Sequence, residues 1–436
     1  MVMKRVAASY KDPGSGVFTD EKGEAFYRSL PHAPALYNDL GFFPRVGEQK
    51  EPGHFAIEKL PFVSYYLEWN LEQFRDSGLF YLDVLKDVLK KGYTLSDATP
   101  LNITYTGKGQ FVFMDHGSVI TRTDNSWPSQ YAFLKEYIVP LMYLRDSRVE
   151  VAQALLPMVN QSDWVLAYRS PWWKRLTFSQ LVIESTLKLM SAPKKAAPSK
   201  SLSSDYIENS ITFYRDFLER LQRRRPASKW GDYYERTITA GGYLERKEQA
   251  VLELVGRVAG EVNGCVDLGA STGYFPERIS GAHPHMTCVA VEADPNAYAQ
   301  LYTSSKRHGF TPVFSNVLQL TPAFGFEGCY QGLGERLSAF ADLLLVLGLV
   351  HHLKQEGGMT FERLFSFFHS ISRPRAFLLI EYIDPEDDKY RLIRNPKHPH
   401  VEDKVGFEQA MADRYDKLHE IRLLETRTLY LARKRD

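Results

Sequence analysis

The stretch that most constrains this chain runs from Gly264 to Phe275 and has the sequence GCVDLGASTGYF. It opens with a short apolar run that predicts a buried strand. Gly269 and Gly273 follow at once, and glycine lets a backbone approach a ligand without a Cβ in the way. A helical pattern then begins at the end of the stretch. A second apolar run comes after this helix, and it ends in an acid, Glu292.

This order of strand, Gly-rich turn, helix, strand and acid is typical of a Rossmann-type nucleotide site. The acid at the tip of the second strand suits a ribose diol, which offers two hydroxyl donors. Ala270 and Ser271 separate the glycines, so the turn lacks the denser pattern that a pyrophosphate favours, and Asp267 nearby disfavours a polyanion. A cationic ligand that carries a ribose fits better. A tight turn with no ligand is the alternative.

The segment VDLGASTGYF resembles motif I of class I S-adenosylmethionine-dependent methyltransferases, and VAVEAD resembles their second-strand motif. The resemblance implies S-adenosylmethionine as the cofactor, bound in an α/β domain with a Rossmann-like, seven-stranded doubly wound sheet. Asn316 stands where this family often has an acid that contacts the adenine amine, and an Asn carbonyl can accept the same hydrogen bond. The residues implied for cofactor binding are Asp267, Gly269, Ala270, Ser271, Thr272, Gly273, Tyr274, Glu292, Asn316 and Leu347.

Apolar runs at 312–318, 342–350, 376–382 and 427–433 predict further strands. The last of them stands where class I methyltransferases finish with an antiparallel hairpin, so the resemblance implies such a hairpin here. His351 and His352 directly follow the fourth strand, where the ligand crevice of an open α/β sheet lies. An imidazole there can take a proton from an attacking hydroxyl or amine, while helix capping or packing is the alternative. Glu381 in the fifth strand is a second candidate base or substrate ligand. Candidate lid or substrate residues before the first strand are Tyr233, Tyr234 and Lys247.

The N-terminal half carries a different set of motifs. Asp97 and Asn102 precede an apolar strand that ends at Asp115, with a glycine two residues later. This resembles the catalytic and metal-binding loops of the protein-kinase-like superfamily, and it implies an acceptor-orienting Asp97 and magnesium ligands at Asn102 and Asp115. A predicted hairpin, a helix, two strands at 42–46 and 54–60, and a long helix precede them in the order of a short kinase-like N-lobe.

Several expected kinase residues are replaced in this half. Leu95 stands where a histidine is usual, and Arg28 falls near the position of the phosphate-gripping lysine. A degraded kinase-like scaffold, a working kinase that binds Mg-ATP, and chance similarity therefore all stay open. The alternative for Asp97 is a carboxylate that caps a helix or a turn. The alternative for Asp115 is an Asx turn that ends a strand.

A chain of 436 residues is too long for one ordinary core. We expect a kinase-like α+β domain over 1–190, a linker and bridging helix over 191–229, and the methyltransferase domain over 230–436. The net charge of +1 gives no case for nucleic acid, and no apolar run is long enough to span a membrane. The three cysteines have no metal-ligand spacing, so no metal site is predicted from them, and buried reduced thiols point to the cytoplasm.

The segments LSDATPLN, WGDYY and LGLVHHL together resemble bacterial methyltransferases related to a nodulation protein of the NoeA type. This resemblance covers most of the chain from about Phe55 onward. We therefore expect methyl transfer to an oxygen or nitrogen of a small molecule or biosynthetic intermediate. A bifunctional kinase–methyltransferase that modifies a saccharide or glycan is the alternative, and the oligomeric state stays open.

Overall fold

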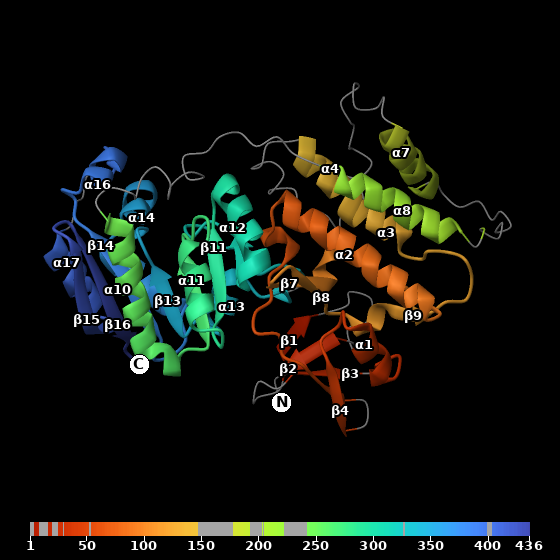
Figure 1. Ribbon diagram of the computed structural model, residues 1–436, viewed down its shortest axis with the longest axis horizontal. Helices are drawn as coiled ribbons and strands as arrows, with labels where there is room; N and C mark the ends of the chain where they lie inside the picture. Colours follow the sequence, from red (N-terminus) through yellow and green to blue (C-terminus); the bar gives the residue numbers. More distant parts are fainter. Residues whose placement is uncertain are drawn as a thin grey trace. The chain divides into compact units, whose positions relative to one another are not determined.

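The computed structural model describes residues 4–7, 16–19, 25–28, 30–51, 54–146, 178–191, 203, 205–221, 242–325, 328–398 and 403–436 (Figure 1). These residues belong to two compact units. The first unit takes in 1–60, 65–104 and 111–225, and the second takes in 61–64, 105–110 and 226–436.

The first unit opens with a five-stranded antiparallel sheet of order β1-β2-β3-β5-β4. The predicted hairpin is confirmed, because β2 pairs with β3. The strand predicted at 42–46 is wrong, since this segment bends and the strand begins only at Val46. The elements are β1 (Lys4–Ala7), β2 (Gly16–Thr19), β3 (Ala25–Arg28), α1 (Pro34–Leu40), β4 (Val46–Glu51) and β5 (His54–Ile57).

The rest of the first unit is mainly helical. Its longest helix is α2 (Leu71–Lys90), which the Asn70 side chain caps by accepting from the Gln73 N–H at 2.9 Å. This helix packs against α8 (Tyr206–Glu219) and α4 (Val139–Asp146). The remaining helical elements are η1 (Tyr66–Glu68), η2 (Pro100–Asn102), η3 (His116–Ser118), α3 (Gln130–Phe133), the π-helical turn η4 (Leu134–Ile138) and α7 (Phe178–Ser191). Two short strand pairs complete the list. The antiparallel pair of β6 (Tyr93–Leu95) with β9 (Val119–Thr121) lies in the first unit. The pair of β7 (Ile103–Gly107) with β8 (Gln110–Phe113) includes residues 105–110, which belong to the second unit.

The second unit is built on a seven-stranded sheet of order β12-β11-β10-β13-β14-β16-β15. The first five strands in this order are parallel to their neighbours, and the last two are antiparallel. This confirms the predicted seven-stranded sheet with its final antiparallel hairpin. The strands are β10 (Gly264–Leu268), β11 (Thr287–Glu292), β12 (Thr311–Phe314), β13 (Leu343–Val346), β14 (Phe377–Ile383), β15 (Tyr415–Leu424) and β16 (Arg427–Lys434).

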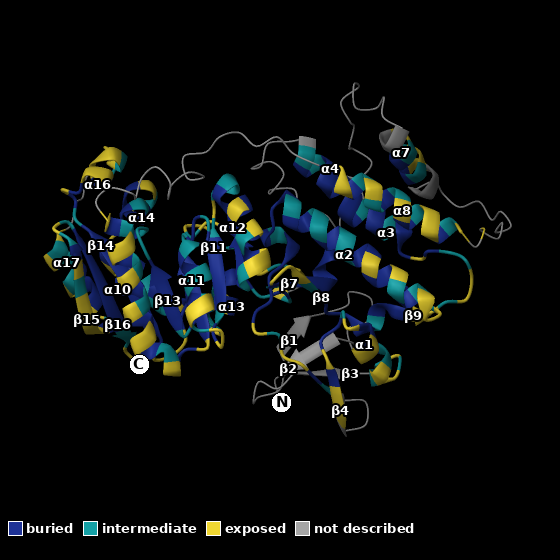
Figure 2. Ribbon diagram, in the orientation of Figure 1, coloured by how far each residue is buried: buried dark blue, intermediate teal, exposed yellow. Residues whose placement is uncertain are grey.

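Helices cover both faces of this sheet, so its parallel strands are buried, apart from the two end residues of β11 (Figure 2). One layer contains α10 (Tyr243–Val258), α11 (Tyr274–Ala282) and α12 (Pro295–His308). The other contains α13 (Leu333–Ser338), α14 (Val350–Gly357), α15 (Phe361–Ser370) and α17 (Lys404–Ala412). The short elements η7 (Ala259–Glu261) and α16 (Asp388–Ile393) complete the unit.

Alternation along each strand divides the core between the two layers. Leu378, Ile380 and Tyr382 of β14 join the apolar cluster on the α13–α17 side. Glu381 therefore points to the opposite face, where it meets α10. This alternation brings the only acid of β14 under a helix that lies 134 residues earlier in the chain.

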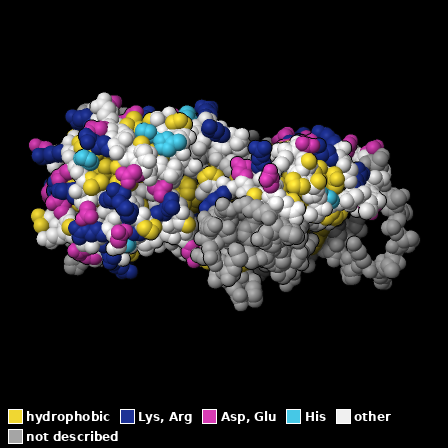
Figure 3. All heavy atoms as spheres, turned by 90° about the horizontal axis from the view of Figure 1, so that it is seen from below, with side chains coloured by type: hydrophobic (Ala, Val, Ile, Leu, Met, Phe, Trp, Pro, Cys, Tyr) yellow, Lys and Arg dark blue, Asp and Glu magenta, His cyan; other side chains and the backbone are white. Residues whose placement is uncertain are grey.

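The surface and the cysteines agree with the composition. On the face shown in Figure 3, basic and acidic side chains of the second unit are interspersed. Cys265, Cys288 and Cys329 are all free thiols, and the first two are buried. Within the described ranges, no helix has the length and apolarity that crossing a membrane requires.

Candidate functional site

The Gly-rich turn joins β10 to α11 with its backbone in the left-handed region. Gly269 has φ +74°, and Gly273, which directly precedes α11, has φ +93°. A Cβ on Gly273 would lie 2.8 Å from Leu301 Cδ1 and 2.9 Å from Phe310 Cζ. The turn is tied to the second strand because the N–H groups of Gly269 and Ala270 donate to the Val291 carbonyl at 2.9 and 3.0 Å. Glycine at 273 is therefore required by packing as well as by backbone conformation.

Glu292, the last residue of β11, is held rigidly by backbone groups. Its Oε2 accepts from the Ser271 N–H at 2.7 Å, and its Oε1 accepts from the N–H groups of Ala293 and Asp294 at 2.8 and 2.7 Å. Burial raises the pKa of this carboxyl above its ordinary value, against the effect of these donors. A carboxylate has about four acceptor directions, so three such bonds leave Oε2 able to accept one more.

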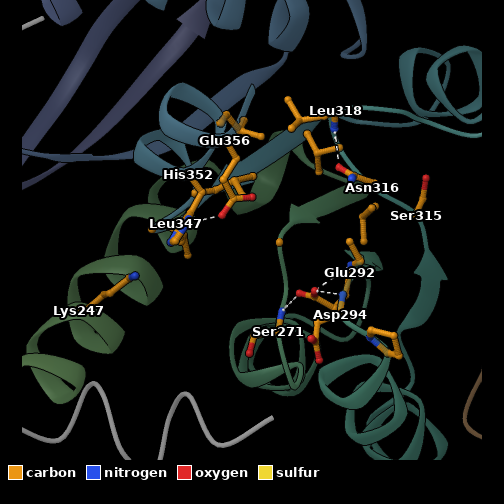
Figure 4. A pocket seen from close by; sticks show the side chains of 18 residues that line it. Lys247, Ser271, Glu292, Asp294, Ser315, Asn316, Leu318, Leu347, His352 and Glu356 are labelled. Carbon is orange, nitrogen blue, oxygen red and sulfur yellow. Dashed lines mark hydrogen bonds and ion pairs between the residues drawn. The ribbon is translucent and has the colours of Figure 1, made fainter. Parts of the chain in front are cut away.

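A cavity of about 340 Å³ opens at the carboxyl ends of the parallel strands (Figure 4). This is where ligands bind in open α/β sheets. Of the residues predicted from the sequence, it is lined by Lys247, Gly269, Ser271, Glu292, Asn316, Leu347 and His352. The sequence did not single out Asp294, Ser315, Leu318, Leu349 and Glu356, which also line it. The first four lie in the segments that follow β11, β12 and β13, which is the signal that could have found them, whereas Glu356 lies within α14.

Two hydroxyl groups in the cavity lining have no hydrogen-bond partner within the described part of the chain. Ser271 Oγ and Ser315 Oγ are both buried, and neither meets a partner among the residues that the structure describes. Buried polar atoms are normally satisfied, so these two hydroxyls mark places where a ligand or water can bind. Asn316 is more exposed, and its Oδ1 accepts from the Leu318 N–H at 2.9 Å.

The other residues predicted for the cofactor lie around this cavity without lining it. Ala270, Thr272, Gly273 and Tyr274 form the turn and the start of α11. Asp267 is only 4% exposed on β10. Burial raises the pKa of Asp267 to about 8, Lys247 opposes this rise, and Glu292 adds to it.

The two histidines at the start of α14 have different surroundings. His352 lines the cavity, and its Nδ1 lies 3.3 Å from Glu356 Oε1, one turn further along the helix. His351 does not line the cavity, and its ring packs in tilted contacts against the rings of His352 and Tyr390, with centroids 4.2 and 5.7 Å away. Burial, followed by the charge of His352, holds the pKa of His351 well below its ordinary value. Its Nδ1 has no partner among the residues described.

Glu381, expected from the sequence as a candidate base or substrate ligand, lies away from the cavity. It is fully buried and does not line the cavity. Its Oε2 accepts from Lys247 Nζ at 2.7 Å, and its Oε1 accepts from the Tyr243 hydroxyl. Burial alone would raise the pKa of Glu381, but Lys247 and Arg427 outweigh it and lower the pKa. A carboxylate engaged in this way is a counter-ion, so we do not retain Glu381 as a candidate base.

The ion pair continues into a buried network beside the cavity. Arg427 at the start of β16 donates to the Tyr243 hydroxyl at 3.0 Å. It also donates to both carboxylate oxygens of Asp387, at 2.9 and 3.0 Å. These bonds hold the pKa of Asp387 at about 2, although burial acts to raise it. The network thus joins α10 to β14, β16 and the segment before α16. Tyr233 and Tyr234, the other two predicted lid residues, lie outside the described residues.

The kinase-like residues of the first unit come together in part. Asn102 Nδ2 lies 3.4 Å from Asp115 Oδ2, and both residues are buried. Asp115 also accepts from the Gly117 N–H at 2.9 Å and from the Ser118 hydroxyl at 2.8 Å, as an Asx turn would. Asp97 accepts from the N–H of the next residue. Across the ranges that the structure describes, no group of three or more His, Cys, Asp or Glu is placed to hold a metal ion.

No family model matches the chain. It is similar to Nodulation protein NoeA of Rhizobium meliloti (strain 1021), with 23% identity over 428 residues that cover 89% of this chain and 86% of that protein. This confirms the resemblance noted in the sequence.

Solved structures also match. One is a SAM-dependent methyltransferase from Aquifex aeolicus, with a TM-score of 0.33, 13% identity, and 47% of this chain and 98% of that chain covered. Another is the 1,6-didemethyltoxoflavin-N1-methyltransferase of Burkholderia thailandensis with S-adenosylhomocysteine bound. Its TM-score is 0.33 at 16% identity, with 56% of this chain and 100% of that chain covered. The fold assignment rests on the strand order of the sheet itself.

Proposed function

We propose that this protein is an S-adenosylmethionine-dependent methyltransferase that acts on an oxygen or nitrogen atom of a small molecule or biosynthetic intermediate. One observation carries the proposal. The cavity at the carboxyl ends of the strands has a rigidly held acid, Glu292, between the Gly-rich turn and the end of β12. This combination suits an adenosine with its ribose at the acid.

The residues present fit this cofactor. Glu292 retains an acceptor direction for a ribose hydroxyl. Ser315 offers a buried hydroxyl with no partner among the described residues, and Asn316 offers a side-chain oxygen, so these two would meet the adenine. Ser271 offers a second such hydroxyl beside the turn, also without a partner in the part of the chain that the structure describes. The acids in the cavity lining, Glu292 among them, favour a ligand with a positive charge.

When bound, S-adenosylmethionine supplies a methyl group on a sulfonium, and the protein has only to place the acceptor in line with it in a dry pocket. Leu347 and Leu349 provide apolar lining that excludes water. His352 lines the same cavity, and an imidazole there can take the proton that an acceptor hydroxyl or amine releases. Glu356 lies within reach of the His352 ring and would orient it.

Calorimetric titration of the full chain with S-adenosylmethionine, and with S-adenosylhomocysteine, tests the cofactor. We expect one site per chain and a loss of affinity of about 10- to 100-fold in Glu292→Ala, which removes a charged hydrogen-bond acceptor. If the wild-type protein binds neither ligand, the proposed function is wrong. Transfer of a labelled methyl group to fractionated small molecules then identifies the acceptor. His352→Ala should slow this transfer without weakening the binding of S-adenosylhomocysteine.

The second candidate is a bifunctional kinase–methyltransferase that modifies a saccharide or glycan. The observation that favours it is the meeting of Asn102 and Asp115, as the kinase-like motif implies. Titration with ATP and magnesium tests it separately. Binding that requires magnesium and is lost in Asp115→Ala would support this candidate. Equal behaviour of the wild-type and Asp115→Ala proteins would leave Asp115 as an Asx turn and remove the candidate.

A further inference from the structure

Lys247 holds an unusual place in the lining of the cavity. It lies on α10, the helix before the first strand of the sheet, and it is only 4% exposed. Its side chain nevertheless reaches the cavity, as Figure 4 shows. Burying an ammonium group without an anionic partner is costly, and Glu381 at 2.7 Å supplies that partner for Lys247. What the ion pair does not explain is why this lysine also faces the cavity.

The charges of the cavity lining are strongly unequal. The lining includes three acids, Glu292, Asp294 and Glu356. Lys247 is the only lysine or arginine among the lining residues that the structure describes. A ligand that matches this pattern carries a net positive charge and one anionic group. That anionic group would bind at Lys247.

The Lys247 ammonium group is bound by Glu381 on the side away from the cavity, and it can still donate toward the cavity. One of its three N–H bonds is directed to Glu381 at 2.7 Å. In the described part of the chain the structure shows no second hydrogen bond from this group. Glu381 is itself fixed by the Tyr243 hydroxyl, and Arg427 secures that hydroxyl in turn. This network holds the ammonium group in place before any ligand arrives.

The positions of the lining residues set the direction in which a nucleoside would lie. In Figure 4, Lys247 lies on the opposite side of the cavity from Ser315 and Asn316. With the ribose at Glu292 and the adenine toward Ser315, the chain attached to the ribose would run toward Lys247. In S-adenosylmethionine this chain ends in an amino acid, and its carboxylate is the one anionic group of the molecule.

We infer that Lys247 is the residue that binds the carboxylate of the cofactor's amino-acid end, with Glu381 as its fixed counter-ion. The inference rests on the proposed function. It makes Lys247 a specificity-determining residue, because ligands that share the nucleoside but lack the amino-acid end gain nothing from it. It also explains why Glu381 of β14 forms an ion pair with Lys247 beside the site.

Two ligands that differ only in this end test the inference. S-adenosylhomocysteine carries the amino acid, and 5′-methylthioadenosine has the same adenosine and thioether without it. Calorimetry of the wild-type chain and of Lys247→Met, a neutral side chain of similar length, measures both affinities. We expect Lys247→Met to lower the affinity for S-adenosylhomocysteine by about 10- to 100-fold, since a charged hydrogen bond to the ligand is lost. The affinity for 5′-methylthioadenosine should stay within about twofold.

Two further variants separate binding from folding. Arg246→Met removes a cation from an exposed neighbour on the same helix, and it should leave both affinities unchanged. Lys247→Met alone removes the cation that donates to the buried Glu381 carboxylate and leaves it with Arg427 at 4.0 Å, which destabilises the fold. The double variant Lys247→Met/Glu381→Gln removes both charges together, and it serves as the test if the single variant does not fold.

Each outcome decides a separate question. If Lys247→Met loses affinity for S-adenosylhomocysteine but not for 5′-methylthioadenosine, the result supports Lys247 as the residue that binds the carboxylate. Equal loss of both ligands, or no loss of either, overturns it while the proposed function stands. A wild-type chain that binds neither ligand overturns the proposed function itself.

Discussion

Replacing Asp267 by Asn gives the sharpest test of the electrostatics at the base of the site. Asp267 lies on β10 and is only 4% exposed. Burial raises the pKa of this carboxyl to about 8, with Lys247 acting against the rise and Glu292 in favour of it. In an unfolded chain the same group titrates at about 3.9. Asp267 is therefore protonated in the folded protein over a range of pH in which the unfolded chain has lost this proton.

The sign and size of the effect follow from proton linkage. Between these two pKa values the folded state binds more protons, so the free energy of unfolding falls as the pH rises. Each pH unit costs about 1.4 kcal/mol, and the slope flattens as the pH approaches the folded pKa. From pH 5 to pH 8 the loss due to Asp267 is about 3 to 4 kcal/mol. An Asn side chain has nearly the same shape and does not titrate, so Asp267→Asn should abolish this loss.

The measurement is urea unfolding of the wild-type and Asp267→Asn chains at pH 5, 6, 7 and 8. Pulsed hydrogen exchange of the β10 and β11 amides, at one fixed labelling pH, reports the second unit separately from the first. The other titrating groups are common to both chains, so they cancel in the difference. Between pH 5 and pH 8, the free energy of unfolding of the variant should rise by about 3 to 4 kcal/mol relative to that of the wild type. Parallel profiles for the two chains would refute the reasoning.

Three further predictions concern the same unit. Gly273→Ala should lower the free energy of unfolding of this unit by about 2 to 4 kcal/mol in urea, because the residue has a positive φ and its Cβ would make two close contacts. Gly256→Ala in α10 is the control: its Cβ would have no described atom within 4 Å, so this variant should be neutral or mildly stabilising. Because the pKa of His351 is depressed, only the unfolded chain gains a proton there as the pH falls below about 6.5, so stability drops. His351→Gln should remove that part of the acid sensitivity in melting curves taken from pH 7 to pH 5. Arg427→Met leaves Asp387 without its bidentate partner and should cost about 3 to 5 kcal/mol, whereas an undiminished melting temperature would contradict the network.

Local patterns were enough to predict the central part of the sheet. Gly269, Gly273 and Glu292 were singled out because a strand, a turn and a second strand lie close together in the sequence. Their geometry depends on groups within one βαβ segment, as the bonds from Ser271 and Ala293 to Glu292 show. Strand ends were less accurate, because the apolar run expected to end at residue 350 supplies a strand only to Val346. The remaining apolar residues line the cavity or begin α14.

Contacts between distant segments could not be predicted in the same way. Glu381 follows a run of apolar residues near a strand end, and that position alone suggests a catalytic acid. Its partner Lys247 lies 134 residues earlier, on a helix whose packing against the sheet leaves no trace in the local sequence. Glu381 is on the α10 face because β14 alternates, and this follows only once the strand register is known. The difference between a base and a counter-ion therefore depends on tertiary structure.

The histidine pair shows the same limit on a smaller scale. Successive residues of a helix point about 100° apart, so His351 and His352 cannot both face one cavity in the same way. Which of them faces it depends on where α14 begins, and the apolar run before it hides that boundary. In the structure the helix begins at Val350, which turns His352 to the cavity and places His351 against Tyr390. His351 then keeps its ring neutral in the interior, and His352 is the residue in position to meet an acceptor.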